Sequence, residues 1–231
     1  MTLKEILLDA LDFKYDIVYW DTIRLPLDDQ GRCSHTFHRS KPAPYLKFAI
    51  NLAKALNMKT VVEIGSCRLA ATEKCIEYYR DPKTLVSPPC CADGHSTYFF
   101  ADGEFDVHTV DIDSHTRTAI EWSYGGLNKQ IPENLHMHIP HDGIEFLSSF
   151  PHGIDLLFLD GWDVGTHEYA EKHLEAYETA KDKLNTPNII LIDDTDFKLN
   201  AGGKDQLLSP RLIKDGYYPV LKGRQILYIK I

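Results

Sequence analysis

The sequence predicts an α/β fold in which a mostly parallel, seven-stranded sheet carries helices on both faces. Four apolar, β-branched runs each end in a carboxylate and lead into a helix-like segment, which is the pattern of parallel strands joined by crossover helices. The chain ends differently. Two β-rich runs joined at Lys222 and Gly223 predict an antiparallel hairpin at the C-terminus.

The individual elements follow from residue 43 onward. Apolar residues at helical spacing predict a helix over 43–56. Further strands and helices are expected as follows: strands over 60–64, 107–110, 135–139, 154–159 and 189–192, and helices over about 70–79, from the possible N-cap Ser114, over 143–150 and over 167–184. Prolines, glycines and small polar residues predict an irregular insertion over 81–104.

The length and composition indicate one domain. A chain of 231 residues with 43% hydrophobic residues can bury one α/β core. We therefore expect an N-terminal helical and lid segment over 1–58, packed on a core over 59–231, with the stretch 197–210 also folding over the ligand pocket. The first 20 residues contain no apolar stretch as long as a signal peptide or a membrane span, which predicts a cytoplasmic protein.

Charge and cysteine content narrow the partners. The net charge of -9 argues against nucleic acid, because phosphate binding needs a basic surface. A small molecule is the expected partner, with no membrane and a possible homo-oligomer. Five cysteines without a repeating spacing favour reduced thiols. Two groups of residues could be drawn as zinc ligands: Cys90, Cys91 and His95, and Cys33, His35 and His38. Neither group supplies the two well-spaced pairs of a zinc site, so the alternative is that these residues are loop or surface features.

Carboxylates at the strand ends are the main functional signal. The carboxyl ends of parallel strands meet along one edge, where open α/β sheets bind their ligands. Carboxylates there can accept hydrogen bonds from ribose hydroxyls or an amine, or hold a cation. The residues in question are Glu63, Asp111, Asp113, Asp160, Asp193 and Asp194.

From about Lys59 to Ile231 the chain resembles the class I S-adenosylmethionine-dependent methyltransferases, which have a Rossmann-like fold. Within them it resembles the metal-dependent O-methyltransferases of the catechol or sugar type. VVEIGS resembles their first motif, an acidic strand end followed by glycine. The resemblance implies that Gly65 and Ser66 lie against the cofactor, and that Glu63 organises the loop or receives the methionine amine.

Two further motifs imply contacts to the nucleoside. TVDID resembles the acidic strand end that accepts both ribose hydroxyls, with Asp111 as first choice and Asp113 as second. HIPHDGIEFL resembles the segment whose aspartate meets the adenine amino group, here Asp142. The alternative for Asp113 and Asp142 is an ordinary helix cap. A dinucleotide cofactor is disfavoured, because GSCRLAAT has one glycine where that fingerprint needs three.

The ends of the fourth and fifth strands imply a metal. LLFLDGWD and LIDDTD resemble the motifs whose acidic residues bind a divalent ion, which assigns Asp160, Asp193 and Asp194 to Mg²⁺ or another divalent cation. A metal-bound hydroxyl would have a lowered pKa and a fixed orientation. The alternative is a single aspartate at the site, with the others capping helices.

The catalytic base is expected at the head of the next helix. His167 resembles the histidine of the sugar-modifying members, although its distance from Asp160 is longer than in their signature; Asp163 or a metal-bound water is the alternative. The acceptor site is expected to include His35, His38, Trp162 and Phe197. The predicted function is O-methylation of a sugar, glycoside or catechol-like hydroxyl, with S-adenosylhomocysteine as product. A non-catalytic cofactor-binding protein and a metal-dependent hydrolase are the alternatives.

Overall fold

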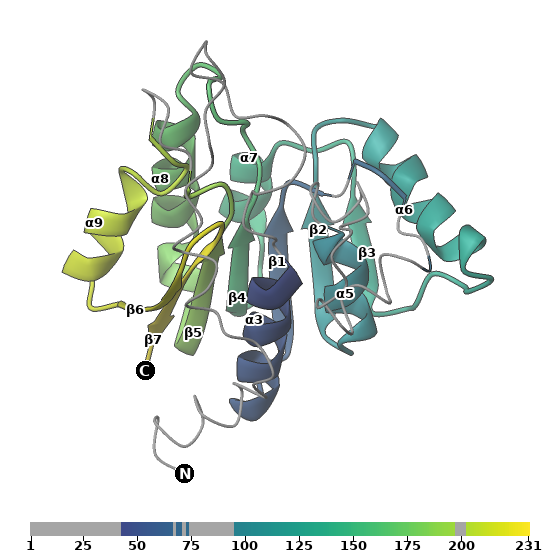
Figure 1. Cartoon of the computed structure of the whole chain (residues 1–231), viewed down its shortest axis with the longest axis horizontal. Coiled ribbons are helices and arrows are strands. Elements are labelled where there is room, and N and C mark those ends of the chain that lie inside the picture. Colours follow the sequence, from purple (N-terminus) through teal and green to yellow (C-terminus); the bar gives the residue numbers. More distant parts are fainter. Residues whose placement is uncertain (1–42, 67, 71–72, 74–94, 197–201) are drawn as a thin grey trace, which may run out of the picture.

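The computed structural model describes residues 43–66, 68–70, 73, 95–196 and 202–231 (Figure 1). Its sheet has seven strands: β1 (Thr60–Ile64), β2 (Asp106–Val110), β3 (Leu135–His138), β4 (Ile154–Leu159), β5 (Leu184–Ile192), β6 (Tyr218–Lys222) and β7 (Ile226–Lys230). They lie in the order β3-β2-β1-β4-β5-β7-β6. Strands β1 to β5 are parallel, and β7 runs antiparallel to both β5 and β6. The predicted fold class and the C-terminal hairpin are confirmed.

Helices cover both faces of the sheet. They are α3 (Ala43–Ala55), α5 (Ser96–Asp102), α6 (His115–Gly126), α7 (Gly143–Ser149), α8 (Tyr169–Ala180, followed by a 3₁₀ turn at Lys181–Lys183) and α9 (Leu208–Lys214). One core cluster joins the sheet to α3, α5 and α6, and α3 and α5 lie in front of the sheet in Figure 1. The other core cluster joins the opposite face to α7, α8 and α9.

Strand β4 shows why the central strands read as continuous apolar runs. It lies between β1 and β5, and the four residues Leu156–Leu159 are all fully buried. A parallel strand covered by helices on both faces has no solvent side, so it needs apolar residues at successive positions instead of alternating ones. This run ends at Asp160, where the chain leaves the sheet for the ligand-binding edge.

All the predicted strands are present, although β5 begins at Leu184 instead of Ile189, and three other element predictions need correction. The insertion predicted over 81–104 contains α5, whose residues Ser96 to Ala101 are all buried. In the described part of the stretch 197–210, which was expected over the pocket, Lys204 binds Asp160 whereas Leu208 packs in the core. The helix predicted over 167–184 ends at Ala180. Ser114 makes no side-chain cap.

Several predictions fall outside the described residues. These are the helix over 70–79 except for isolated residues, the lid over 1–42, all five cysteines, His35, His38 and Phe197. Within the described residues, none of the helices has both the length and the apolar character needed to cross a bilayer.

Candidate functional site

A cavity of about 570 Å³ lies at the carboxyl ends of β1, β2, β4 and β5. Its lining combines the loops that follow these strands with the start of α7 and the turn of the C-terminal hairpin. Eight of the predicted site residues line it: Gly65, Ser66, Asp111, Asp113, Asp142, Asp160, Asp193 and Asp194. Glu63 and His167 are not among its lining residues. The topology thus brings most of the predicted site into one place.

Gly65 is required by its backbone conformation and by its surroundings. Its φ of 92° lies in the left-handed region that favours glycine. A Cβ atom there would lie 2.5 Å from the backbone nitrogen of Gly161, which leaves no room for a side chain. The loop after β1 therefore lies directly against the loop after β4, and both line the cavity.

Glu63 lies beneath this loop and is fully buried. Its carboxylate accepts hydrogen bonds from Thr97 and Thr109, each at 2.6 Å, and from the Ser96 hydroxyl. Burial raises the pKa of Glu63 to about 7, although these hydroxyl donors lower it in part. Thr109 Oγ1 also lies 2.6 Å from Ser66 Oγ. Glu63 and Thr109 therefore link α5 to the loop after β1, and a role of Glu63 toward a cofactor stays a prediction.

Asp111 holds the first two loops together at the edge of the cavity. Its Oδ2 accepts a hydrogen bond from the Ser66 amide at 2.8 Å, and its Oδ1 accepts one from the Asp113 amide at 2.8 Å. A carboxylate oxygen has two lone-pair sites, so each oxygen can accept one more donor. This arrangement fits a pair of adjacent ribose hydroxyls.

Asp113 and Asp142 both cap helices, as the alternative reading expected. Asp113 Oδ1 accepts from the His115 amide at 2.9 Å, and hydrogen bonds from the His115 backbone and side chain lower the pKa of Asp113. Asp142 Oδ1 accepts from the amides of Ile144 and Glu145 at 2.9 and 3.0 Å. Both carboxylates also line the cavity, so the capping role does not replace their predicted contacts to the nucleoside.

The predicted metal ligands are adjacent, and two buried cations lie among them. Asp160, Asp193 and Asp194 each offer an oxygen within 4.8 Å of the others. Lys204 Nζ lies 2.7 Å from Asp160 Oδ1 and 3.3 Å from Asp194 Oδ2. Arg224 binds both oxygens of Asp193 at 3.1 Å and Asp194 Oδ1 at 2.7 Å.

Lys204 and Arg224 supply positive charge that the sequence analysis had assigned to a metal ion, and they affect the pKa values of Asp160 and Asp193. Burial raises the pKa of Asp160 well above its usual range; Lys204 opposes this shift, and the two neighbouring aspartates add to it. Burial would also raise the pKa of Asp193, but the nearby Arg224 and Lys204 lower it overall. Three carboxylates need positive charge beside them, and two side chains supply it. A divalent ion at these carboxylates would lie beside two buried cations that already bind them, so the metal assignment stays a prediction.

Lys204 and Arg224 were missed by the sequence analysis. Arg224 follows from strand register, because β7 pairs Ile226 with Ile192 and so brings the hairpin turn opposite Asp194. The position of Arg224 could be predicted from the sequence if the C-terminal hairpin were placed beside β5. Lys204 had no comparable signal, because a lysine after two glycines is common in surface loops.

The remaining predicted residues, Asp163, Trp162 and His167, lie at or outside the rim of the cavity. Asp163 pairs with Arg68 across the rim, and Trp162 lines the cavity beside it. The His167 side chain is 88% exposed, with Glu168 Oε2 3.6 Å from its Nδ1. His173 lies below Trp162 with a ring-centroid distance of 5.3 Å, and burial lowers the pKa of His173 to about 3. The role of His167 as base stays a prediction.

Comparison with known proteins supports the fold assignment. No protein-family model and no curated protein sequence matches the chain. The SAH-bound crystal structure of the methyltransferase PaMTH1 from Podospora anserina is 13% identical, with 98% of this chain and 87% of that chain covered and a TM-score of 0.55. The cofactor-bound structure of Rv0187 from MTB is 14% identical, with 98% and 88% covered and a TM-score of 0.52. The chain therefore has the fold of the class I S-adenosylmethionine-dependent methyltransferases.

Proposed function

We propose that this protein transfers a methyl group from S-adenosylmethionine to a hydroxyl group of a small molecule. The observation that carries the proposal is the position of Asp111, whose two oxygens bracket the loops after β1 and β2 at the edge of the cavity. Each oxygen can accept one further hydrogen bond, and two adjacent ribose hydroxyls supply that pair of donors. Gly65 lets the loop after β1 lie directly against the loop after β4, so that both loops line the cavity beside Asp111.

The acceptor side of the proposal rests on Asp160. When bound, the cofactor supplies a methyl group attached to a positively charged sulfur. The acceptor oxygen would form a bond to the methyl carbon while the bond between that carbon and the sulfur breaks. Asp160 lines the cavity and Lys204 fixes its Oδ1 at 2.7 Å, so the carboxylate is held in one orientation. A carboxylate so placed can accept the hydroxyl proton as the new bond forms. Trp162 would form an apolar wall beside the acceptor.

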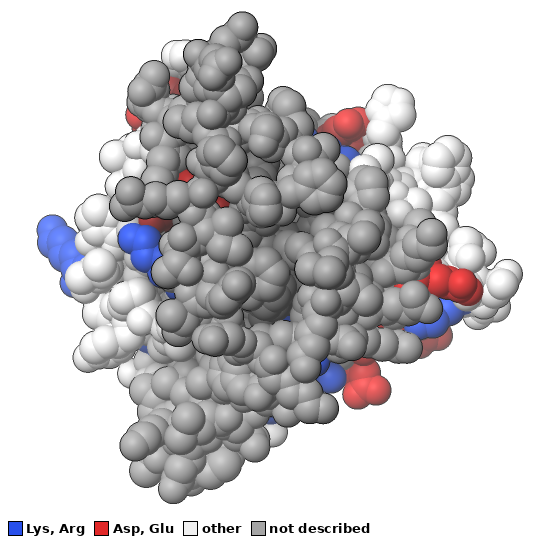
Figure 2. Space-filling view, in the orientation of Figure 1, with Lys and Arg blue, Asp and Glu red and all other residues white. Residues whose placement is uncertain are grey.

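Net charge supports a small acceptor over a nucleic acid. The chain carries a net charge of -9, and on the part of the face in Figure 2 that is not grey, Lys and Arg side chains are interspersed with Asp and Glu. A phosphate backbone is bound by basic residues gathered on one surface. A sugar, glycoside or catechol-like hydroxyl suits the carboxylate-lined cavity better. Because an odd number of cysteines favours reduced thiols, we place the reaction in the cytoplasm.

The divalent ion expected from the sequence is not part of this mechanism. Lys204 and Arg224 supply the positive charge that the three aspartates need, and they bind oxygens that a metal would otherwise take. Chelation tests whether the reaction depends on magnesium. The metal-assisted mechanism predicts that turnover is lost when the metal is removed.

Calorimetric titration with S-adenosylmethionine, with and without Mg²⁺, tests the cofactor assignment. We expect one binding site per chain and no change in affinity with Mg²⁺. Methyl transfer is then assayed on sugar, glycoside and catechol acceptors by release of S-adenosylhomocysteine. Absence of cofactor binding would overturn the proposal. Binding without transfer to any acceptor would favour the non-catalytic cofactor-binding protein, and binding of a metal alone would favour the hydrolase.

A further inference from the structure

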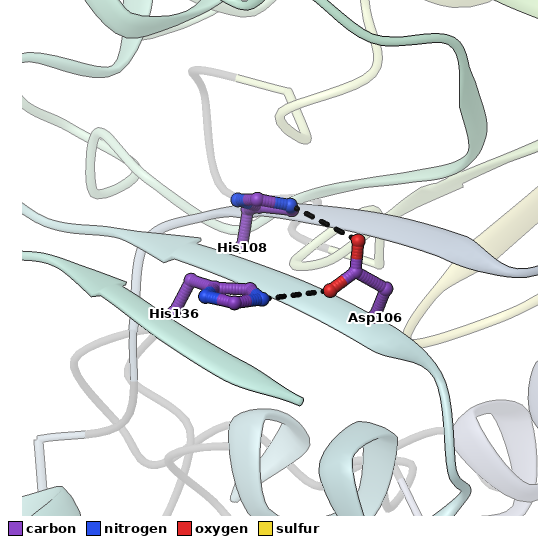
Figure 3. A group of neighbouring side chains, drawn as sticks. All are labelled: Asp106, His108 and His136. Atoms are coloured by element: carbon purple, nitrogen blue, oxygen red, sulfur yellow. Dashed lines mark hydrogen bonds and ion pairs between the residues drawn. The ribbon is translucent and has the colours of Figure 1, made fainter. Parts of the chain in front are cut away.

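Three side chains at the outer edge of the sheet form a second cluster, away from the cavity. Asp106 and His108 lie two residues apart on β2, so their side chains point to the same face of the sheet. The parallel register pairs His108 with His136 of β3, and their rings stack with centroids 4.6 Å apart. Figure 3 shows both rings turned toward the carboxylate of Asp106. We call Asp106, His108 and His136 the edge cluster.

Distances within the edge cluster suit a small cation with nitrogen and oxygen ligands. One ligand atom from each residue lies within 4.8 Å of the others. His108 Nε2 is 3.4 Å from Asp106 Oδ2, and His136 Nε2 is 2.7 Å from Asp106 Oδ1. Tetrahedral zinc sites have metal–ligand distances of about 2.0 to 2.2 Å, which separate neighbouring ligand atoms by roughly 3.3 Å. The edge cluster reaches this spacing with small side-chain movements.

The environment of His108 leaves one ring nitrogen ready to bind an ion. His108 Nδ1 lies 3.1 Å from His138 Nε2, a hydrogen-bonding distance. With the proton on Nδ1, donated to His138, the Nε2 atom keeps its lone pair facing Asp106. That Nε2 atom is buried, and its 3.4 Å contact with Asp106 Oδ2 does not meet hydrogen-bond geometry. Metal-binding histidines commonly donate the proton of the other ring nitrogen in this way, and a buried ring nitrogen without a partner calls for an explanation.

Aromatic rings pack around the buried side of the edge cluster, and its other side is open to solvent. The His108 ring packs edge-on against Phe150 with centroids 4.8 Å apart, and the His138 ring lies 4.4 Å from Phe146. Asp106 and His136 are 50% and 43% exposed, so an ion can enter from solvent and keep a water ligand. Two histidines and one carboxylate with an open position form a ligand set that zinc uses.

We propose that Asp106, His108 and His136 form a binding site for a divalent transition-metal ion such as zinc. The ion would link β3, which among the described strands pairs only with β2, to the rest of the sheet. None of the three residues lines the cavity, so the site is independent of the proposed methyl transfer. Magnesium is excluded as its preferred ion, because imidazole nitrogen is a poor ligand for it.

Zinc titration of the full-length, chelator-treated protein tests the site by calorimetry and by thermal unfolding. We expect one zinc ion to bind the parent and raise its Tm, with an excess of Mg²⁺ failing to compete. His136→Gln and Asp106→Asn should each weaken zinc affinity about tenfold or more and reduce the rise in Tm. His115→Gln is the matched control, because His115 is an exposed histidine that also pairs with an aspartate, Asp113. It should bind zinc as the parent does.

The variants can also overturn the proposal. His136 is 43% exposed, so His136→Gln should fold with a metal-free Tm close to that of the parent. If the parent fails to bind zinc, the edge cluster is only a hydrogen-bonded group. If zinc binds equally well to the parent, His136→Gln and Asp106→Asn, the ion lies elsewhere in the chain, and this site does not exist.

Discussion

The guanidinium of Arg224 binds both carboxylate oxygens of Asp193, with Nε–Oδ1 and Nη2–Oδ2 distances of 3.1 Å each. Both side chains are buried, at 5% and 4% exposure. The pair connects the C-terminal hairpin to the end of β5, where the cavity begins. Two parallel N–H···O bonds fix the carboxylate in orientation as well as in charge.

Arg224→Met should therefore destabilise the protein strongly. The substitution leaves the buried carboxylate of Asp193 without the partner that binds both of its oxygens, and breaking a buried pair in this way costs about 3 to 5 kcal/mol. Chemical denaturation measures the change in the free energy of unfolding. Lys222→Met in the exposed part of the same hairpin is the control and should change it by less than about 0.5 kcal/mol. Equal stabilities of the two variants would show that the pair contributes nothing.

Chelation tests whether the three aspartates need a metal. Because Lys204 and Arg224 already form ion pairs with them, we expect turnover to persist after treatment with EDTA and to be unaffected by added Mg²⁺. Loss of turnover that Mg²⁺ restores would instead support the metal-assisted mechanism. The His136→Gln variant is assayed in parallel, so that removal of an ion from the edge cluster is not mistaken for an effect at the cavity.

Much of the sheet could be predicted because its signal is local. The run Ile154–Leu159 lies between Gly153 and Asp160, and β4 has the predicted boundaries. Helix α5 could not be found in this way. It has seven residues, six of them buried, so it lacks the polar face that creates helical periodicity, and turn-forming residues flank it.

The site could be predicted only where it follows from strand ends. Asp111 and Asp160 were identified because parallel strands bring their carboxyl ends together. Lys204 and Arg224 depend on contacts between residues 44 and 31 positions apart in the chain, with Asp160 and Asp193 respectively. Such contacts arise from register and loop path, so the sequence could not show that two cationic side chains lie among the three aspartates.

Asp111→Ala tests the cofactor site. The variant removes an acceptor for the ribose hydroxyls, and a hydrogen bond to a charged group contributes about 1.5 to 3 kcal/mol. The affinity for S-adenosylhomocysteine, measured by calorimetry, should fall roughly tenfold or more. Asp113→Ala, the second candidate, removes a helix cap and should have a smaller effect. If only Asp113→Ala weakens binding, the two assignments must be exchanged.

Glu63→Gln tests the buried carboxyl through the pH dependence of stability. The pKa of Glu63 is raised from 4.5 to about 7 in the folded state. Between these values the folded protein keeps a proton that the unfolded chain releases, so this group's contribution to stability is lost as the pH rises. At 1.36 kcal/mol per pKa unit, the loss by pH 8 is roughly 3 kcal/mol.

The glutamine variant keeps the size of the side chain and does not titrate. Its stability relative to the parent should therefore rise by roughly 3 kcal/mol between pH 4.5 and pH 8, as followed by denaturation at several pH values. Taking the difference between variant and parent cancels the other titrating groups. Glu121→Gln, on the exposed side of α6, is the control for the substitution itself, and the pH-dependent difference should be larger for Glu63→Gln. A flat difference for Glu63→Gln would place its folded-state pKa near the ordinary value.

The last prediction separates the two candidate bases. Asp160 lines the cavity, whereas His167 is 88% exposed and does not line it. Asp160→Asn keeps an acceptor for Lys204 but cannot take a proton, so turnover should fall about 10² to 10⁴-fold with cofactor affinity retained. His167→Ala should change turnover by less than about threefold if it has no part in this step. In the parent, turnover should rise with pH through a pKa above the usual aspartate value, because burial raises the pKa of Asp160. A large loss in His167→Ala with Asp160→Asn active would restore histidine as the base.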